Sequence, residues 1–260
     1  LRERPTLVTA IPTFEMFPLC ADLAGGRVTG VPSLDDPAPL DALLDRVDDT
    51  TGLVVAITPH NPTGASIDTS TLLALADALP SEVTLLVDLA YAEFADEDPT
   101  VTLLDRGGVL LVRTLSKAWG LAGLRVGYVL GDADVVAKVR ETGPPFPLSG
   151  PSLWLAERAL ALGRRVTEPY VDAVRSERAR LAKALEDLGA EPFPSQANFV
   201  LARLHDARAV WSRLDRAGVR VRRFDHSPEL LRFTLPGDAE AFDTLLAALG
   251  EALTEGGSDE

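Results

Sequence analysis

The fold of this chain is decided by the stretch Thr114-Leu-Ser-Lys-Ala-Trp-Gly-Leu-Ala-Gly-Leu-Arg-Val-Gly-Tyr128. It follows an apolar, strand-like run at residues 109–112, and it places Lys117 among two hydroxyl groups and an arginine. A lysine amine condenses with a carbonyl group to form a Schiff base, while hydroxyl groups and a planar guanidinium bind phosphate. The stretch therefore predicts a binding place for a phosphorylated aldehyde.

Pyridoxal phosphate carries both of these groups. Lys117 can take its aldehyde, and Thr114, Ser116 and Arg125 can donate to its phosphate. The glycines between Lys117 and Arg125 would let the backbone turn so that both side chains face one site. An isolated lysine in a glycine-rich loop is more often a solvated surface residue, and only these neighbours favour a site here. The glycine spacing does not match GxGxxG, which disfavours a dinucleotide site.

Composition narrows the possible functions. The 260 residues are 46% hydrophobic, which is ample for a core. A formal net charge of -14, from 39 acidic and 25 basic residues, disfavours nucleic-acid and anionic-membrane surfaces. One cysteine, Cys20, allows no internal disulfide, and with three histidines no Cys/His metal site is expected. With no apolar run of membrane-spanning length and no signal pattern, we expect a cytoplasmic protein that binds small molecules.

The order of apolar runs predicts an α/β fold. Short β-rich runs lie at residues 6–10, 53–57, 83–87, 109–112 and 126–130. Continuous runs of this kind are typical of parallel strands that are buried on both faces. Residues 68–79, between two of the runs, have leucines and alanines at helical spacing after a capping aspartate. This βαβ pattern predicts an open sheet with functional groups at the strand ends.

A second domain is predicted after the proline- and glycine-rich segment 143–151. Residues 152–188 fit two helices separated near 167–170. We expect a large domain at residues 1–148 and a hinge helix with a small domain at 149–260. In the latter, strands are predicted at 197–201, 219–222 and 230–235, helices at 207–217 and 238–253, and a frayed polar tail at 255–260.

Four further residues supply what a pyridine ring would need. A carboxylate at the ring nitrogen keeps it protonated, a role suited to Asp88 at the end of the run 83–87. Asn61 and Tyr91 can donate to the ring hydroxyl oxygen, and Phe14 can stack on the ring. Taken singly, each has a structural explanation: a turn for Asn61, a helix cap for Asp88, core packing for Phe14. Together they favour one cofactor site.

These motifs resemble the class I/II pyridoxal-phosphate aminotransferases of fold type I. The resemblance rests on Asn61-Pro-Thr-Gly64, on Asp88-Leu-Ala-Tyr-Ala-Glu-Phe94 and on the lysine stretch. Within the family the chain is most similar to the histidinol-phosphate aminotransferase branch, which also has an Ala-Asn-Phe segment like residues 197–199. The likeness extends over about residues 6–236. It implies a three-layer large domain with a mostly parallel sheet and a smaller C-terminal α/β domain.

The resemblance also implies a role for each matching residue. Lys117 would bind the cofactor covalently and move the proton, and Asp88 would hold the ring nitrogen. Asn198 is expected to be mainly structural. The remaining cofactor contacts implied are Asn61 and Tyr91 on the ring oxygen, Phe14 on the ring face, and Thr114, Ser116 and Arg125 on the phosphate.

The substrate is expected to be anionic. Arg232, in Leu231-Arg-Phe-Thr-Leu235, matches the arginine with which the family binds a substrate carboxylate or, in the histidinol-phosphate branch, a phosphate. The alternative for Arg232 is a surface charge on a strand edge. Arg222 could add a second phosphate contact, although with Arg220 and Arg223 beside it a solvated charge is an equally good interpretation.

Three functions remain open from the sequence. The first is transfer of an amino group from an amino donor, such as histidinol phosphate or an amino acid, to 2-oxoglutarate by a homodimer. The second is decarboxylation of the threonine-phosphate type, which uses the same cofactor residues. The third is a truncated, non-catalytic relative, because family members carry an N-terminal segment with a glycine-rich phosphate loop ahead of the position of Leu1. We expect the first.

Overall fold

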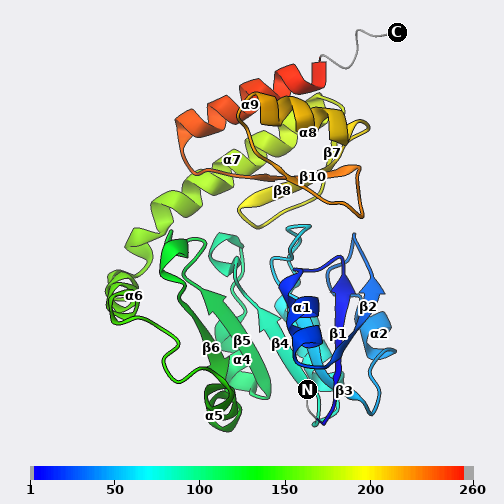
Figure 1. Cartoon of the computed structure of the whole chain (residues 1–260), viewed down its shortest axis with the longest axis vertical. Helices are drawn as coiled ribbons and strands as arrows, with labels where there is room; N and C mark the ends of the chain where they lie inside the picture. The colour runs from blue at the N-terminus through cyan, green and yellow to red at the C-terminus, as the bar shows by residue number, and fades with distance from the viewer. Residues whose placement is uncertain (1–2, 255–260) are drawn as a thin grey trace.

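Two β-sheets organise the part of the chain that the computed structural model describes, residues 3–254 (Figure 1). The larger sheet has the strand order β2-β1-β3-β4-β5-β6. Its first five strands are mutually parallel, and β6 runs antiparallel to β5 at the edge. The strands are β1 (Thr6–Ile11), β2 (Arg27–Pro32), β3 (Thr51–Ile57), β4 (Thr84–Asp88), β5 (Val109–Thr114) and β6 (Gly127–Gly131).

Helices cover both faces of this sheet, because successive strand residues point to opposite sides. On one face, Leu7 and Val55 pack against Ala21 of α1 (Met16–Leu23). On the other, Val8 and Val54 belong to the cluster that buries the apolar side of α3 (Thr69–Ala78). The remaining helices of this half are α2 (Leu40–Leu44), α4 (Thr100–Arg106) and α5 (Ala133–Thr142), with 3-10 turns η1 (Ala92–Phe94) and η2 (Ala122–Leu124). The predicted three-layer α/β fold is confirmed.

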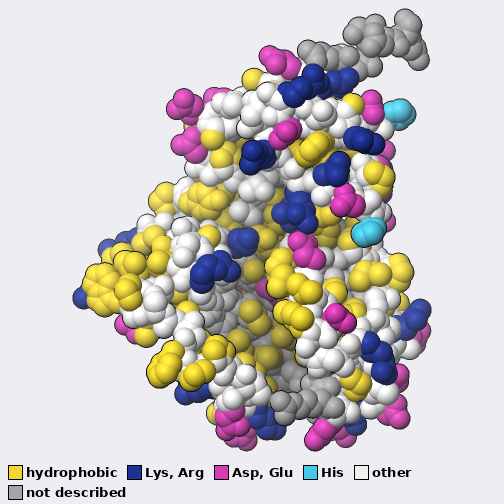
Figure 2. All heavy atoms as spheres, in the orientation of Figure 1, with side chains coloured by type: hydrophobic (Ala, Val, Ile, Leu, Met, Phe, Trp, Pro, Cys, Tyr) yellow, Lys and Arg dark blue, Asp and Glu magenta, His cyan; other side chains and the backbone are white. Residues whose placement is uncertain are grey.

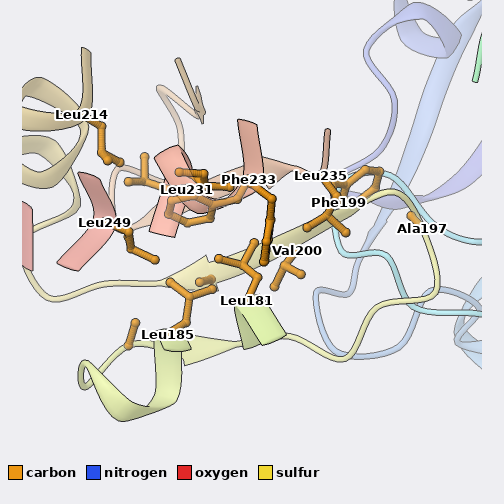
Figure 3. Packing of buried hydrophobic residues seen from close by; sticks show 14 of the residues in the cluster. Leu181, Leu185, Ala197, Phe199, Val200, Leu214, Leu231, Phe233, Leu235 and Leu249 are labelled. Carbon is orange, nitrogen blue, oxygen red and sulfur yellow. The ribbon is translucent and has the colours of Figure 1, made fainter. Parts of the chain in front are cut away.

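The smaller sheet lies beyond the upper end of the first (Figure 1) and is antiparallel throughout, in the order β7-β8-β10-β9. Its strands are β7 (Glu191–Pro192), β8 (Phe199–Arg203), β9 (Arg222–Arg223) and β10 (Leu230–Thr234). Three helices pack on one face: α7 (Glu168–Asp187), α8 (Ala207–Arg216) and α9 (Ala239–Thr254). Figure 3 shows Leu181, Leu214 and Leu249 from these helices converging on Leu231 and Phe233.

The two sheets are joined by α6 (Gly150–Leu162), the 3-10 turn η3 (Gly163–Val166) and α7. The Ser149 hydroxyl accepts the Ser152 N–H at 3.2 Å and caps α6. Two helices are present as predicted, but η3 separates them at residues 163–166, earlier than the predicted 167–170, which fall mostly in the first turn of α7. Residues 143–149 contain neither helix nor strand, in line with the proline and glycine density. The exact domain boundary at residues 148/149 remains a prediction.

The structure differs from the sequence prediction in several places, and it contains α2, α4, α5 and β7, for which no element was predicted. The strand predicted at 219–222 is shortened to Arg222–Arg223, because Val219 and Val221 turn into the core instead of extending the ladder with β10. The strand β2 and helix α1 were not predicted, since Gly30 and Pro32 weaken the strand pattern. The frayed tail predicted at 255–260 lies outside the described residues. Among the described helices, none is both long and apolar enough to span a bilayer.

Candidate active site

The candidate site lies at the carboxyl ends of three neighbouring strands. Asn61 follows β3, Asp88 ends β4, and Lys117 follows β5. Because β3, β4 and β5 are adjacent and parallel, their carboxyl ends meet at one edge of the sheet. The smaller sheet faces this edge and contributes Arg232 from β10.

Asp88 is buried, with 8% of its surface exposed. The Ala90 N–H donates to its Oδ1 at 2.9 Å, and within residues 3–254 no hydrogen bond is made to Oδ2. Burial raises the pKa of this carboxyl group, while the Ala90 N–H and the positive charge of Lys117 oppose the rise. A cationic N–H group placed at Oδ2 would be stabilised strongly in this environment.

Lys117 faces the same space as Asp88. Its Nζ lies 5.4 Å from the centroid of the Tyr91 ring. Burial lowers the pKa of Lys117 first, the charges of Arg232 and Arg125 lower it further, and Asp88 acts in the opposite direction. A lowered pKa increases the fraction of neutral amine, which is the form that attacks a carbonyl group.

Arg232 links the two sheets at the site. Its Nη1 donates to Asn61 Oδ1 in a short hydrogen bond, and its guanidinium lies 4.6 Å over the Phe199 ring. Its Nε is buried, and no residue within 3–254 forms a hydrogen bond with it. Since a guanidinium only donates, it fixes the oxygen of the Asn61 amide, and the Asn61 NH2 is left to donate elsewhere. Burial lowers the pKa of Arg232. Burial also raises the pKa of Tyr91, and the positive charge of Arg232 opposes that rise.

Thr114, Ser116 and Arg125 lie on the turn around Lys117. The Thr114 and Ser116 hydroxyl groups are 2.9 Å apart, and the Ser116 N–H donates to Thr114 Oγ1 at 3.1 Å. Arg125 is exposed and has φ 56, a left-handed conformation that ends the η2 turn. Its Nη1 donates to the Ala122 carbonyl at 2.9 Å. Arg125 is near enough for its charge to lower the pKa of Lys117. The shared phosphate-binding role of Thr114, Ser116 and Arg125 stays a prediction.

Phe14 and Arg222 lie at the margin of the site. Phe14 is half-buried beyond β1 and packs edge-on against Phe17, with ring centroids 6.2 Å apart. Its role as a ring-stacking residue stays a prediction. Arg222 lies directly opposite Arg232 in the β9–β10 register and forms an ion pair with Glu15 at 3.1 Å. The interpretation of Arg222 as a solvated charge did not include this ion pair, which connects the smaller sheet to α1 beside the larger sheet.

A cavity of about 490 Å³ opens beside Lys117. Its lining includes Ser116, Trp119, Tyr170 and Asn198. The sequence interpretation treated Asn198 as mainly structural and did not consider Tyr170. The Ala-Asn-Phe segment was a usable signal for Asn198, whereas Tyr170 lies in the first turn of α7, the end of that helix next to the larger domain (Figure 1).

His60, next to Asn61, is a further buried polar residue that the sequence interpretation did not single out. It is 1% exposed, and its Nδ1 lies 2.9 Å from the Thr63 hydroxyl. Burial lowers the pKa of His60 to about 4, so the ring is neutral near pH 7. A neutral, packed imidazole supports the turn that carries Asn61.

Sequence relatives of the chain share one activity in their names. A model of the family described as aminotransferase class I and II matches residues 3–249. The histidinol-phosphate aminotransferase of Xylella fastidiosa (strain Temecula1) is 39% identical over 260 aligned residues, which cover 95% of this chain and 71% of that protein. The enzyme of the same name from Xanthomonas campestris pv. campestris is 36% identical, with the same two coverages.

Solved structures give the same result. Histidinol-phosphate aminotransferase from Sinorhizobium meliloti, in complex with pyridoxal-5'-phosphate, superposes with a TM-score of 0.88 at 31% identity, covering 96% of this chain and 70% of that one. L-threonine-O-3-phosphate decarboxylase from Porphyromonas gingivalis has a TM-score of 0.80 at 21% identity, covering 96% and 77%, a likeness of fold alone. From the family match and these relatives, the chain belongs to the class I and II aminotransferases.

Proposed function

We propose that this aminotransferase uses pyridoxal 5'-phosphate to move an amino group from a phosphate-bearing amine of the histidinol-phosphate type to a 2-oxo acid such as 2-oxoglutarate. One observation carries the proposal. Lys117, Asp88 and Arg232 come from three separate places in the sequence, but the structure brings them close together. The charges of Asp88 and Arg232 both act on the pKa of Lys117, and Arg232 also donates a hydrogen bond to Asn61. A nucleophile, an acidic ring partner and an anion-binding group are what such a reaction needs.

The residues fit the cofactor. Asp88 offers an Oδ2 that no described residue binds, as the protonated ring nitrogen requires. The Asn61 NH2 group, set by Arg232, and the Tyr91 hydroxyl are available to the ring oxygen. Thr114, Ser116 and Arg125 would meet the phosphate. When bound, the cofactor withdraws electrons from the carbon next to the amino nitrogen and so allows a proton to leave it.

Lys117 would carry the proton. In the neutral form favoured by its lowered pKa, Nζ accepts a proton, and as the ammonium form it returns that proton to a neighbouring carbon. Asp88 stays anionic when it faces a protonated ring nitrogen, because that cation counteracts the effect of burial. Phe14 would cover the ring.

The arginines would select the substrate. Arg232, and beside it Arg222, present guanidinium groups from one face of the smaller sheet. Two planar cations suit a phosphate monoester in the donor and a distal carboxylate in the acceptor. The names of the relatives in Xylella and Xanthomonas support a histidinol-phosphate-like donor.

We also propose that the active form is a cytoplasmic homodimer. Large apolar side chains of α6 are exposed, among them Trp154 at 57% and Leu162 at 54%. Figure 2 shows hydrophobic side chains gathered at the edge of the molecule where α6 lies. Exposed apolar patches of this kind mark protein contacts more often than free surface. Analytical ultracentrifugation with Trp154→Glu against the unchanged chain tests the dimer.

Product analysis tests the reaction. The purified chain with pyridoxal 5'-phosphate, histidinol phosphate and 2-oxoglutarate should form glutamate and no carbon dioxide. Release of carbon dioxide from threonine phosphate without glutamate would replace the proposal with a decarboxylase. A chain that gains no visible absorption on addition of pyridoxal 5'-phosphate would instead be a non-catalytic relative.

A further inference from the structure

An ion pair between Glu15 and Arg222 lies at the margin of the candidate site. Glu15 lies at the start of α1, and its Oε1 accepts a hydrogen bond from Arg222 Nη2 at 3.1 Å, although the two residues are 207 positions apart. Both side chains are more than half exposed, at 65% for Glu15 and 53% for Arg222. The pair therefore lies at the solvent side, between the large sheet's first helix and the smaller sheet.

Arg222 and Arg232 form a doubly cationic surface. They are direct partners in the antiparallel β9–β10 register, so both side chains leave the same face of the sheet. On β10 the neighbours Leu231 and Phe233 point into the core, which leaves Arg232 on the opposite face, toward the first sheet. The charge of Arg222 lowers the pKa of Arg232, and Glu15 raises it, so both lie within electrostatic reach of Arg232.

Without a bound anion, two arginines side by side repel each other. Glu15 compensates for this repulsion with its negative charge. Its carboxylate contacts Arg222, and its charge also raises the pKa values of Arg232 and Tyr91. Its carboxylate has the chemistry of the group that the arginines would bind in a substrate. It is also exposed, so it can swing away into solvent.

We propose that Glu15 is an internal counter-ion of the two arginines, which the anionic tail of the substrate must displace. This inference rests on the proposed function, in which the arginines bind that tail. Displacement weakens every anion by the same interaction, so small free anions such as inorganic phosphate bind poorly. A substrate that makes further contacts in the site overcomes the penalty. Glu15 thus weakens the binding of the substrate tail and of free anions alike, and only a substrate with further contacts in the site still binds at low concentration.

The test compares anion binding in three chains saturated with pyridoxal 5'-phosphate, so that the cofactor's own phosphate position is filled. Calorimetric titration with inorganic phosphate at pH 8 should show binding about threefold to tenfold tighter in Glu15→Gln than in the unchanged chain. Acetate, with one negative charge instead of two, should gain only about twofold to threefold. The KM of the phosphate-bearing donor should fall by the same factor as the phosphate dissociation constant.

Glu191→Gln is the matched control. Glu191 also forms an exposed ion pair with an arginine, Arg203, at 3.2 Å, at the β7 edge of the smaller sheet, opposite the edge formed by β9. Removal of its charge changes the net charge of the protein equally, and phosphate binding should stay unchanged. Equal phosphate affinity in Glu15→Gln and Glu191→Gln would overturn the proposal.

A double-mutant cycle tests the route. In Arg222→Gln, the further change Glu15→Gln should alter phosphate binding by less than about twofold, because the two residues act as a pair. A Glu15→Gln effect that persists in full without Arg222 would contradict the counter-ion role. Glu15→Asp, one methylene shorter, should shift binding in the same direction as Glu15→Gln but less, and it provides a second variant if the glutamine form folds poorly.

Failure of the proposed function would be recognised separately. If the unchanged chain does not transaminate histidinol phosphate but Glu15→Gln still tightens phosphate binding, the donor is wrong and the counter-ion role stands. If the chain transaminates histidinol phosphate and Glu15→Gln changes neither the KM nor phosphate binding, the counter-ion role is wrong and the function stands.

Discussion

The two halves of the candidate site are built differently. The half on the larger sheet has a buried centre: Asn61, Asp88 and Tyr91 are each at most 9% exposed, whereas Lys117 is half-buried and Arg125 is exposed. The half on the smaller sheet carries Arg232 and the exposed Arg222, which comes from a strand of two residues. Burial on one side shifts pKa values and excludes water, whereas exposure on the other lets an ion pair open and close.

We expect this difference to divide the work of the site, with the buried groups acting in the chemical step and the arginines in substrate binding. Groups that must be held in a changed protonation state need a low dielectric and fixed neighbours, which a parallel sheet with covered faces supplies. Groups that bind and release a charged substrate lose less on desolvation when water reaches them. Changes in the buried half should therefore act on the chemical step, and changes in the arginine half on substrate binding.

The largest effect is expected at Lys117. Lys117→Ala removes the amine that we propose bonds the cofactor and moves the proton, so activity should fall more than about 10⁴-fold. Borohydride treatment should fix labelled pyridoxal phosphate to the unchanged chain and to Lys138→Ala, an exposed lysine of α5, but not to Lys117→Ala. A label found on Lys138 or Lys183 would refute the assignment.

Asp88→Asn should lower kcat by about 10²- to 10³-fold, because an amide does not hold the ring nitrogen protonated. The change keeps the side chain's size and its contact with the Ala90 N–H, so folding should be retained. Steady-state kinetics and cofactor absorption measure the effect, with Asp105→Asn on α4 as a control. A rise in KM without a loss in kcat would show that Asp88 acts on substrate binding and not on the chemical step.

The burial of the larger-sheet half can be tested through the pH dependence of stability that His60 causes. The unfolded chain takes up a proton on this residue below pH 6.5, whereas the folded chain does so only at about pH 4. The unfolding free energy therefore falls as pH drops from 6.5 to about 4, by up to about 3 kcal/mol. His60→Asn should lose this pH dependence in urea unfolding between these values. The exposed His226→Asn should keep it, and equal slopes in all three chains would contradict the burial argument.

Arg232→Lys should raise the KM for anionic substrates by about tenfold to thirtyfold, since a lysine keeps the charge but loses the planar pair of donors. The loss in kcat should be smaller, because a lysine keeps the positive charge that acts on the pKa of Lys117 and loses mainly the hydrogen bond to Asn61. Arg203→Lys is the control, for Arg203 also stacks on a phenylalanine, at 5.4 Å from Phe193, away from the site. A kcat loss equal to that of Asp88→Asn would erase the distinction between the halves.

Much of the buried half could be predicted from the sequence because its residues follow strands directly. Asp88 comes immediately after an apolar run and Lys117 three residues after the end of β5, and parallel strands bring such positions to one edge whatever the details of packing. The helix at 68–79 was predicted for a similarly local reason: Asp68 accepts the Thr71 N–H at 2.8 Å and caps α3. Strand β2, with a glycine and a proline, had no such local signal.

The sequence by itself determined the fold class, the family and the residues that stand at the strand ends. Only the tertiary structure decided which charges meet across the two sheets. The pairing of Glu15 with Arg222 and the hold of Arg232 on Asn61 join residues 207 and 171 positions apart. Such contacts depend on how two separately formed sheets are oriented, and no periodicity or spacing along the chain records that orientation.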